Sequence, residues 1–131
     1  MSRRVVVTGM GIVSPLGVGL SHVWERITNG ESGVKAIEHI DVSDLPARVA
    51  GVVPRGTDAG QFNIDAHIEP KEQKRMDTFI HFAIGAADEA IAHAGISAFS
   101  DEQKLRTGVM IGSGIGGLPS IEETVLLMQE K

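Results

Sequence analysis

Two clusters of glycine constrain the fold more than any other feature of the chain. They are Gly9, Gly11, Gly17 and Gly19, behind the β-branched run Val5–Thr8, and Gly112, Gly114, Gly116 and Gly117, behind the run Gly108–Ile111. Glycine is used where the backbone must turn tightly or approach another segment closely. A short apolar run that ends in such a turn is typical of a buried strand in a parallel sheet. Two such strands are therefore predicted.

The segment between the two predicted strands contains two predicted helices. Residues 21–29 have apolar side chains at helical spacing, with Ser21 as the expected N-cap. A longer helix is predicted over residues 70–94, because apolar residues recur at every third or fourth position and a glycine follows as a stop signal. Residues 31–68 are irregular apart from one short strand predicted near residues 48–53.

The C-terminal part predicts further helix but no further strand. A helical turn is predicted at residues 101–106 and a helix at residues 118–128, with Pro119 in its first turn. The alternation of strand and helix favours an α/β fold with a parallel sheet. Because two strands make a poor sheet and the last helix still continues at Met128, we expect residues 1–131 to be an incomplete part of one domain. An open sheet edge would make such a piece poorly soluble.

Composition excludes several classes of protein. The formal net charge of −5 disfavours a nucleic-acid partner, because phosphate binding needs a basic surface. No stretch approaches the roughly 20 apolar residues of a membrane span. The apolar run behind Arg3 and Arg4 is too short for a signal peptide. We therefore expect a cytoplasmic protein that binds neither nucleic acid nor membrane.

The residue types that usually carry chemistry are sparse. The chain has no cysteine, which removes disulfides, thiolate metal ligands and any thiol nucleophile. Its five histidines form no His-x-His or His-Glu-x-x-His pair, so no metal site is predicted. Ser113 lies between two glycines, but a nucleophile elbow needs glycine two residues away on both sides. Ser113 is therefore not predicted to be a nucleophile.

The second glycine cluster allows two interpretations. Residues 112–117 satisfy Gly-x-Gly-x-x-Gly between a predicted strand and a predicted helix, which is the context of a dinucleotide-binding turn. The acidic residue expected about 20 residues later would be Glu130, which lies in predicted helix rather than at a strand end. The alternative is a strand-to-helix crossover packed against neighbouring backbone. The first cluster has Ser14-Pro15 where a third glycine would stand, and it predicts a close-packed loop.

A basic cluster stands out in this acidic chain. Lys71, Lys74 and Arg75 are spaced at i, i+3 and i+4, which places them on one face of the predicted helix. Cations in the first turns oppose the helix dipole, at a cost of about a few tenths of a kcal/mol. Their position therefore suggests docking of an anionic partner, and a solvated face with Glu72 as a neighbour is the alternative.

Four segments resemble the β-ketoacyl-[acyl-carrier-protein] synthases, in order and at the spacing of that family. They are Arg3–Gly17, Trp24 with Asn29–Gly33, Lys71–Asp77 and Ile111–Leu118. The resemblance covers essentially all 131 residues. It implies the thiolase-like fold, in which two similar α/β halves stack as α-β-α-β-α layers and form a homodimer. This chain would supply the N-terminal portion of that fold.

The resemblance also implies an activity. Members of the family are acyltransferases that condense an acyl group with a malonyl group on acyl carrier protein, releasing carbon dioxide. Their cysteine nucleophile, two histidines and lysine belong to the part of the family that lies beyond residue 131. The resemblance implies no cofactor. We therefore expect no catalytic residue in this chain and no activity from it alone.

Two sets of site residues follow from the resemblance by position. Ile115, with Gly114 and Gly116, matches the turn that gates the acyl pocket, and an isoleucine there favours synthase type II, because type I resembles Gly-Ser-Gly-Gly-Gly. Lys71, Lys74 and Arg75 match the basic positions that meet the acidic carrier protein, which favours docking over a solvated face. A polyketide-type ketosynthase and a non-catalytic partner resembling a chain-length factor remain alternatives, with a dinucleotide-binding module as the third.

Overall fold

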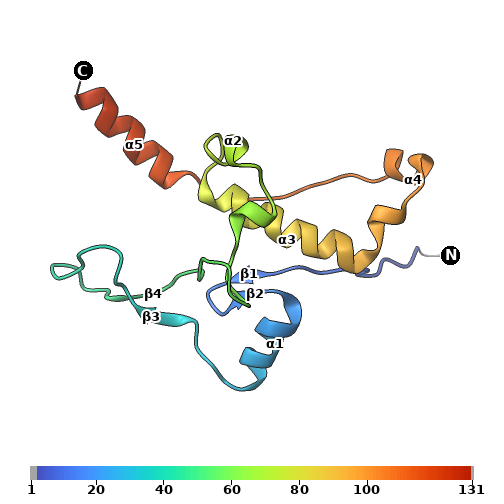
Figure 1. Cartoon of the computed structure of the whole chain (residues 1–131), viewed down its shortest axis with the longest axis horizontal. Coiled ribbons are helices and arrows are strands. Elements are labelled where there is room, and N and C mark those ends of the chain that lie inside the picture. Colours follow the sequence, from blue (N-terminus) through green and yellow to red (C-terminus); the bar gives the residue numbers. More distant parts are fainter. Residues whose placement is uncertain (1–2, 131) are drawn as a thin grey trace.

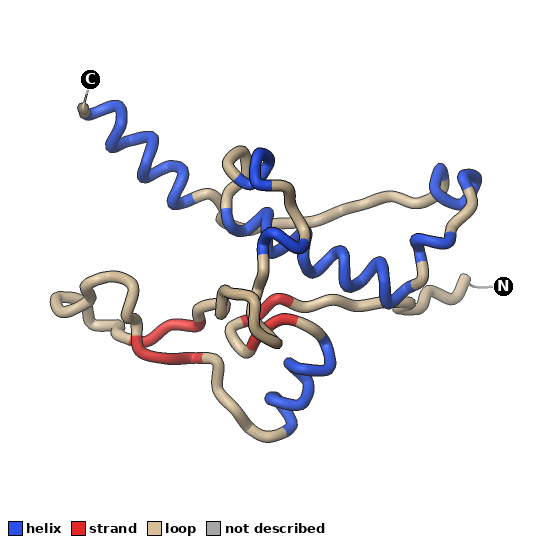
Figure 2. The backbone as a smooth tube through the Cα atoms, in the orientation of Figure 1, coloured by secondary structure: helices blue, strands red, loops and turns tan. Residues whose placement is uncertain are grey.

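The computed structural model describes residues 3–130, and helix α3 (Thr78–Ala94) lies at its centre (Figure 1). The remaining elements are, in chain order, β1 (Val13–Ser14), β2 (Gly17–Val18), α1 (Leu20–Thr28), β3 (Val34–Ala36), β4 (Val49–Gly51), η1 (Ile64–Ala66), α2 (Pro70–Gln73), η2 (Ile96–Ala98), α4 (Asp101–Leu105) and α5 (Leu118–Gln129). Much of the chain between these elements is loop (Figure 2).

The strands of the described residues form two separate antiparallel pairs (Figure 2). Strand β1 pairs with β2, with Val13 opposite Val18, and β3 pairs with β4, with Lys35 opposite Ala50. The strand predicted near residues 48–53 is confirmed as β4. The other three, which have two or three residues each, were not predicted.

The two predicted buried strands are wrong for this structure. Residues 5–8 and 108–111 belong to no strand, and Val5 and Met110 are 93% and 98% exposed. A strand forms only where a neighbour accepts its backbone hydrogen bonds, and nothing in residues 3–130 pairs with either segment. Both segments run from right to left in Figure 1, one drawn below α3 and the other above it.

The prediction that the first glycine cluster is a close-packed loop is confirmed for Gly9 and Gly11, whereas residues 13–18 form the β1–β2 hairpin. Gly9 and Gly11 lie against the backbone of α3, whose small residues Ala86, Ala90 and Ala94 repeat every four positions. A Cβ added to Gly9 would lie 2.6 Å from the backbone nitrogen of Ala94, and one added to Gly11 would overlap the carbonyl oxygen of Ala86. Only glycine permits this approach of loop to helix.

Helix α1 is capped from a distant part of the chain. The expected N-cap, Ser21, is wrong: the helix starts at Leu20, and its N-cap is Gly19, which offers no side chain. Instead Glu89 of α3 accepts hydrogen bonds from the backbone N–H of Leu20 (2.7 Å) and of Ile12 (2.9 Å). One carboxylate therefore joins α1 and the approach to β1 to the central helix.

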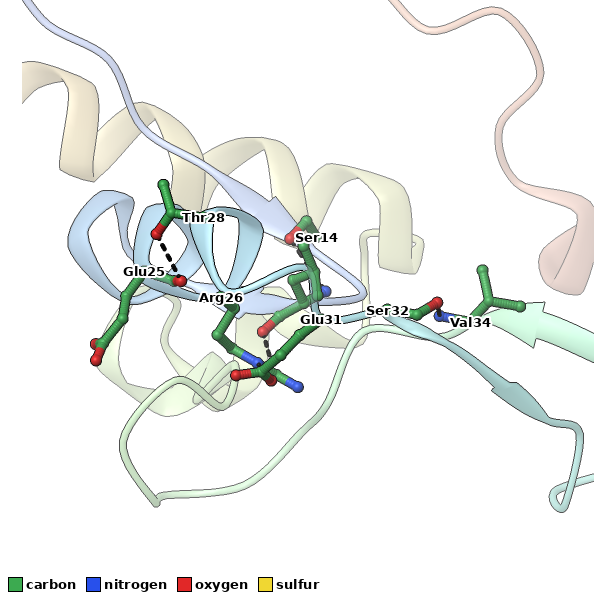
Figure 3. A network of polar contacts seen from close by, with 8 residues as sticks. Ser14, Glu25, Arg26, Thr28, Glu31, Ser32 and Val34 are labelled. Carbon is green, nitrogen blue, oxygen red and sulfur yellow. Dashed lines mark hydrogen bonds and ion pairs between the residues drawn. The ribbon is translucent and has the colours of Figure 1, made fainter.

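The other end of α1 is held by Arg26. Its Nε lies 2.6 Å from Oε2 of Glu31, and its Nη1 donates to the carbonyl oxygen of Leu16 at 2.5 Å. Figure 3 shows Arg26 beside Glu31, close to Ser14 of β1. These contacts tie the loop after α1 to the β1–β2 hairpin.

The small core lies mainly between the loop before α2 and helix α3. Phe62 and Ile68 are buried, and Val23 of α1 is buried as well. The Phe62 ring meets Phe82 edge-on at 5.1 Å and fills the space left by Gly85, where a Cβ would lie 2.6 Å from the ring. Gly85 thus lets the loop pack directly on the helix.

The helix predicted over residues 70–94 is wrong in its middle and right at its end. Helix α2 stops at Gln73, and α3 starts at Thr78 with Asp77 as its N-cap, whose side chain accepts the Thr78 N–H at 2.5 Å. This local bond competes with a continuous helix. Gly95 ends α3 with a φ of 69°, as predicted.

The two C-terminal helices are confirmed. Helix α4 begins with a capping box between Ser100 and Gln103, and α5 carries Pro119 in its first turn. In the part of the chain that the structure describes, no helix is both long and apolar enough to cross a membrane.

Candidate functional site

The glycine-rich turn at residues 112–117, which we call the gate turn, sits on the start of α3. Gly116 lies against the ring of Phe79, where a Cβ would lie 2.8 Å from the ring carbons. Gly117 has a φ of 75° and is the N-cap of α5. Only the end of the turn is packed, and it packs on a side chain rather than on backbone, while residues 108–111 before it form no strand. Both interpretations of the glycine pattern therefore stay predictions.

Asp77 joins the gate turn's helix to α3. Its Oδ2 accepts hydrogen bonds from the hydroxyl (2.6 Å) and the backbone N–H (3.3 Å) of Ser120, while its Oδ1 accepts the N–H of Thr78. One carboxylate thus caps two helices. It also argues against a dinucleotide here, because a phosphate at the start of α5 would meet an anion that already occupies the helix N-terminus.

The same contacts lower the pKa of Asp77. The hydrogen bond from the Ser120 hydroxyl is the main cause, partly opposed by desolvation, with smaller contributions from the N–H groups of Ser120 and Thr78 and from nearby His81. The ionised form of Asp77 is therefore favoured in the folded chain. Its contribution to stability is present at neutral pH and is lost as the pH falls through that lowered pKa.

The residues predicted to form the acyl pocket lie beside an apolar cleft rather than in it. The cleft has a volume of about 550 Å³ and is lined by Val13, by side chains from the first half of α3 and by residues 111–113. Ile115 is 83% exposed, and a Cβ at Gly114 would meet no atom within 4 Å. A role for Ile115, Gly114 and Gly116 in acyl binding therefore stays a prediction.

The basic residues share one exposed segment but not one helix face. Lys71 lies in α2, Lys74 is its C-cap, and Arg75 lies beyond the helix. The expected cost against a helix dipole is therefore wrong, because α2 has a single turn, in which Lys71 is near both ends, and Lys74 and Arg75 lie after its last residue. Arg75 pairs with Glu72 across 3.1 Å, and all three cations are exposed. We call residues 70–76 the docking segment.

The histidines near these residues make structural contacts. His81 is buried and its Nε2 donates to the Gln73 carbonyl at 3.1 Å, while Nδ1 of His67 lies 2.7 Å from Asp88. Nδ1 of His93 accepts the Met10 N–H at 3.2 Å. Over residues 3–130, no group of three or more histidine and carboxylate side chains could hold a metal ion.

Sequence reasoning missed Asp77 and Glu89. Asp77 directly precedes a threonine and an apolar run, which is a signal for an N-cap that the longer helical pattern concealed. Glu89 left no such signal, because the N–H groups that it binds lie 69 and 77 residues earlier in the chain.

Comparison with known proteins identifies the family. Residues 2–131 match the family described as β-ketoacyl synthase, N-terminal domain. The chain belongs to this family. Membership in the β-ketoacyl synthases implies the thiolase-like fold, and the described residues are a small mixed α/β portion.

Several β-ketoacyl synthases are similar over nearly the whole chain. The 3-oxoacyl-[acyl-carrier-protein] synthase 2 of Rhizobium meliloti (strain 1021) is 46% identical over 130 residues, which is 98% of this chain and 31% of the relative. The synthase 2 of Vibrio harveyi is 39% identical over 98% of this chain and 29% of its own length. The synthase 2 of Vibrio cholerae is 42% identical over 92% of this chain and 27% of its own length. The chain thus spans less than a third of the length of these relatives.

Proposed function

We propose that this chain forms the N-terminal part of a 3-oxoacyl-[acyl-carrier-protein] synthase II. The observation that carries the proposal is the match of residues 2–131 to the synthase family, with relatives named synthase 2 at 39 to 46% identity. The reaction would join an acyl group to malonyl-carrier protein with loss of carbon dioxide. A homodimer, a cytoplasmic location and an acidic carrier protein as partner belong to the same proposal.

The extended segments support the layered form of the fold. Residues 5–8 and 108–111 are apolar, exposed and drawn in the same direction along α3 (Figure 1). We propose that the synthase of which this chain is a part has the layered α-β-α-β-α arrangement. The exposed valines and Met110 of these segments would then be covered by further layers, which would offset the cost of leaving them in water.

The activity is tested by a chimaera in which residues 1–131 replace the matching part of the Rhizobium synthase. We expect the chimaera to convert acyl- and malonyl-carrier protein into a product two carbons longer, detected by mass spectrometry. The 131-residue chain alone is expected to give no product, because it has no cysteine to carry the acyl group. Condensation by the isolated chain, or a folded chimaera that releases no carbon dioxide, would refute the proposal.

The acyl pocket is tested in the same chimaera by Ile115→Phe. A bulkier ring in the gate turn should lower kcat/KM for tetradecanoyl-carrier protein by about ten-fold or more and leave hexanoyl-carrier protein nearly unchanged, because only the long chain must pass the ring. Ile40→Phe is the matched control, since Ile40 is also exposed and lies in a loop between β3 and β4. An unaltered ratio of the two activities would remove Ile115 from the pocket.

A further inference from the structure

Asp77 lies between the two regions on which the proposed function depends. It follows the docking segment (residues 70–76) directly and precedes α3, and its Oδ2 binds Ser120 in the first turn of α5, just after the gate turn. Phe79, two residues further along, supports Gly116 of that turn. The end of the docking segment and the end of the gate turn are therefore joined through residues 77–79.

The gate turn has little else to hold it. Cβ atoms added at Gly112 and Gly114 would meet nothing within 4 Å, and Ile115 is largely exposed. Among the described residues, the side-chain hydrogen bonds that link residues 112–120 to another element are those from Ser120 to Asp77. The Asp77 side chain is half-exposed. Its link to Ser120 is strengthened because two donors converge on one ionised oxygen.

We propose that Asp77 is a positioning residue for acyl-chain selection, which holds the gate turn against the end of the docking segment. The inference rests on the function proposed above for these two regions. In this arrangement the docking segment, the start of α3 and the gate turn move as one unit. The distance between the docking segment and the gate turn would then be fixed. A carrier protein bound at the docking segment would present its acyl chain to the gate turn at that distance.

Two substitutions break the link from opposite sides. Asp77→Ser keeps a good N-cap for α3 but cannot reach Ser120, and Ser120→Ala removes the hydroxyl donor while leaving the α3 cap intact. Each should change the ratio of kcat/KM for tetradecanoyl- over hexanoyl-carrier protein in the chimaera by about five-fold, roughly one lost hydrogen bond. The double variant should change it no further than Asp77→Ser alone, because that substitution already removes both the hydroxyl bond and the weaker N–H bond from Ser120.

Matched variants separate positioning from a general loss of stability. Ser120→Thr retains the hydroxyl donor and should keep the wild-type ratio of the two kcat/KM values. Ser100→Ala removes a serine cap from α4, which lies in another part of the chain, so it should lower the melting temperature and leave the ratio unchanged. KM for the carrier protein should stay within about two-fold in all of these variants, because the basic residues of the docking segment are untouched.

Hydrogen exchange provides a second measurement that needs no turnover. Asp77→Ser and Ser120→Ala should speed amide exchange in residues 112–121, while residues 80–90 of α3 keep their protection. If the gate turn exchanges as in the wild type, or if Ser120→Ala leaves the chain-length ratio unchanged, the positioning role is refuted.

The outcomes also distinguish this inference from the function on which it rests. If Ile115→Phe changes the ratio and neither Asp77→Ser nor Ser120→Ala does, the gate stands and the role of Asp77 fails. If the folded wild-type chimaera forms no product, the proposed function fails, and with it the assignment of Asp77 to acyl selection, even if exchange shows that Asp77 holds the turn.

Discussion

Replacing Gly11 with alanine should destabilise the chain by about 3 kcal/mol, because the added methyl group would force the N-terminal loop away from α3. The new Cβ would overlap the carbonyl oxygen of Ala86 and lie 2.8 Å from the backbone nitrogen of Ala90. Both obstacles are main-chain atoms of a regular helix, which cannot rotate away as a side chain can. The loop must move instead, and the bond between Ile12 and Glu89 would be strained with it.

The measurement is urea unfolding of the 131-residue chain, followed by circular dichroism of its helices. Gly108→Ala is the matched control, because a Cβ at Gly108 has no atom within 4 Å and the φ of Gly108 is not positive. It should be neutral or raise stability by less than about 1 kcal/mol. Equal stabilities for the two variants would mean that the loop does not pack on α3 in solution.

Reversing the charge of Lys71, Lys74 and Arg75 to glutamate should raise KM for the carrier protein by about 100-fold at low salt in the chimaera. The three side chains are exposed and only Arg75 has an anionic partner among the described residues, so their field is available to an acidic protein. The value of kcat should change little, because the three cations are proposed to act in the encounter with the carrier protein and not in the chemical step. Adding salt should reduce the difference, since exposed charges are screened.

The matched control reverses three exposed cations elsewhere, Lys35, Lys104 and Arg106, which changes the net charge by the same amount. Lys104 pairs with Asp101 much as Arg75 pairs with Glu72, so the two sets also lose a similar surface ion pair. If the control raises KM as much as the docking variant does, net charge rather than the docking segment governs the encounter.

Local signals in the sequence predicted the parts of this fold that depend on a few neighbouring residues. Gly95 ends α3 and Pro119 lies in the first turn of α5, as predicted, because a left-handed φ and a missing N–H favour those positions in any helix. The family was also predicted from the sequence, since four motifs occur in the order and at the spacing of the family, and the match of residues 2–131 confirms it. The absence of cysteine likewise excludes a thiol nucleophile from this chain, however the chain folds.

Only the tertiary structure decided where distant segments meet. The β-branched run after Arg4 predicted a buried strand, yet Val5–Val7 are exposed, because pairing and burial require a neighbour that propensity alone does not supply. Glu89 caps a helix that begins 69 residues earlier in the chain. Asp77 caps both α3 and α5, and the single helix predicted over residues 70–94 is interrupted before it. Such bonds form because a folded backbone brings a carboxylate to unpaired N–H groups, and sequence spacing carries no record of that approach.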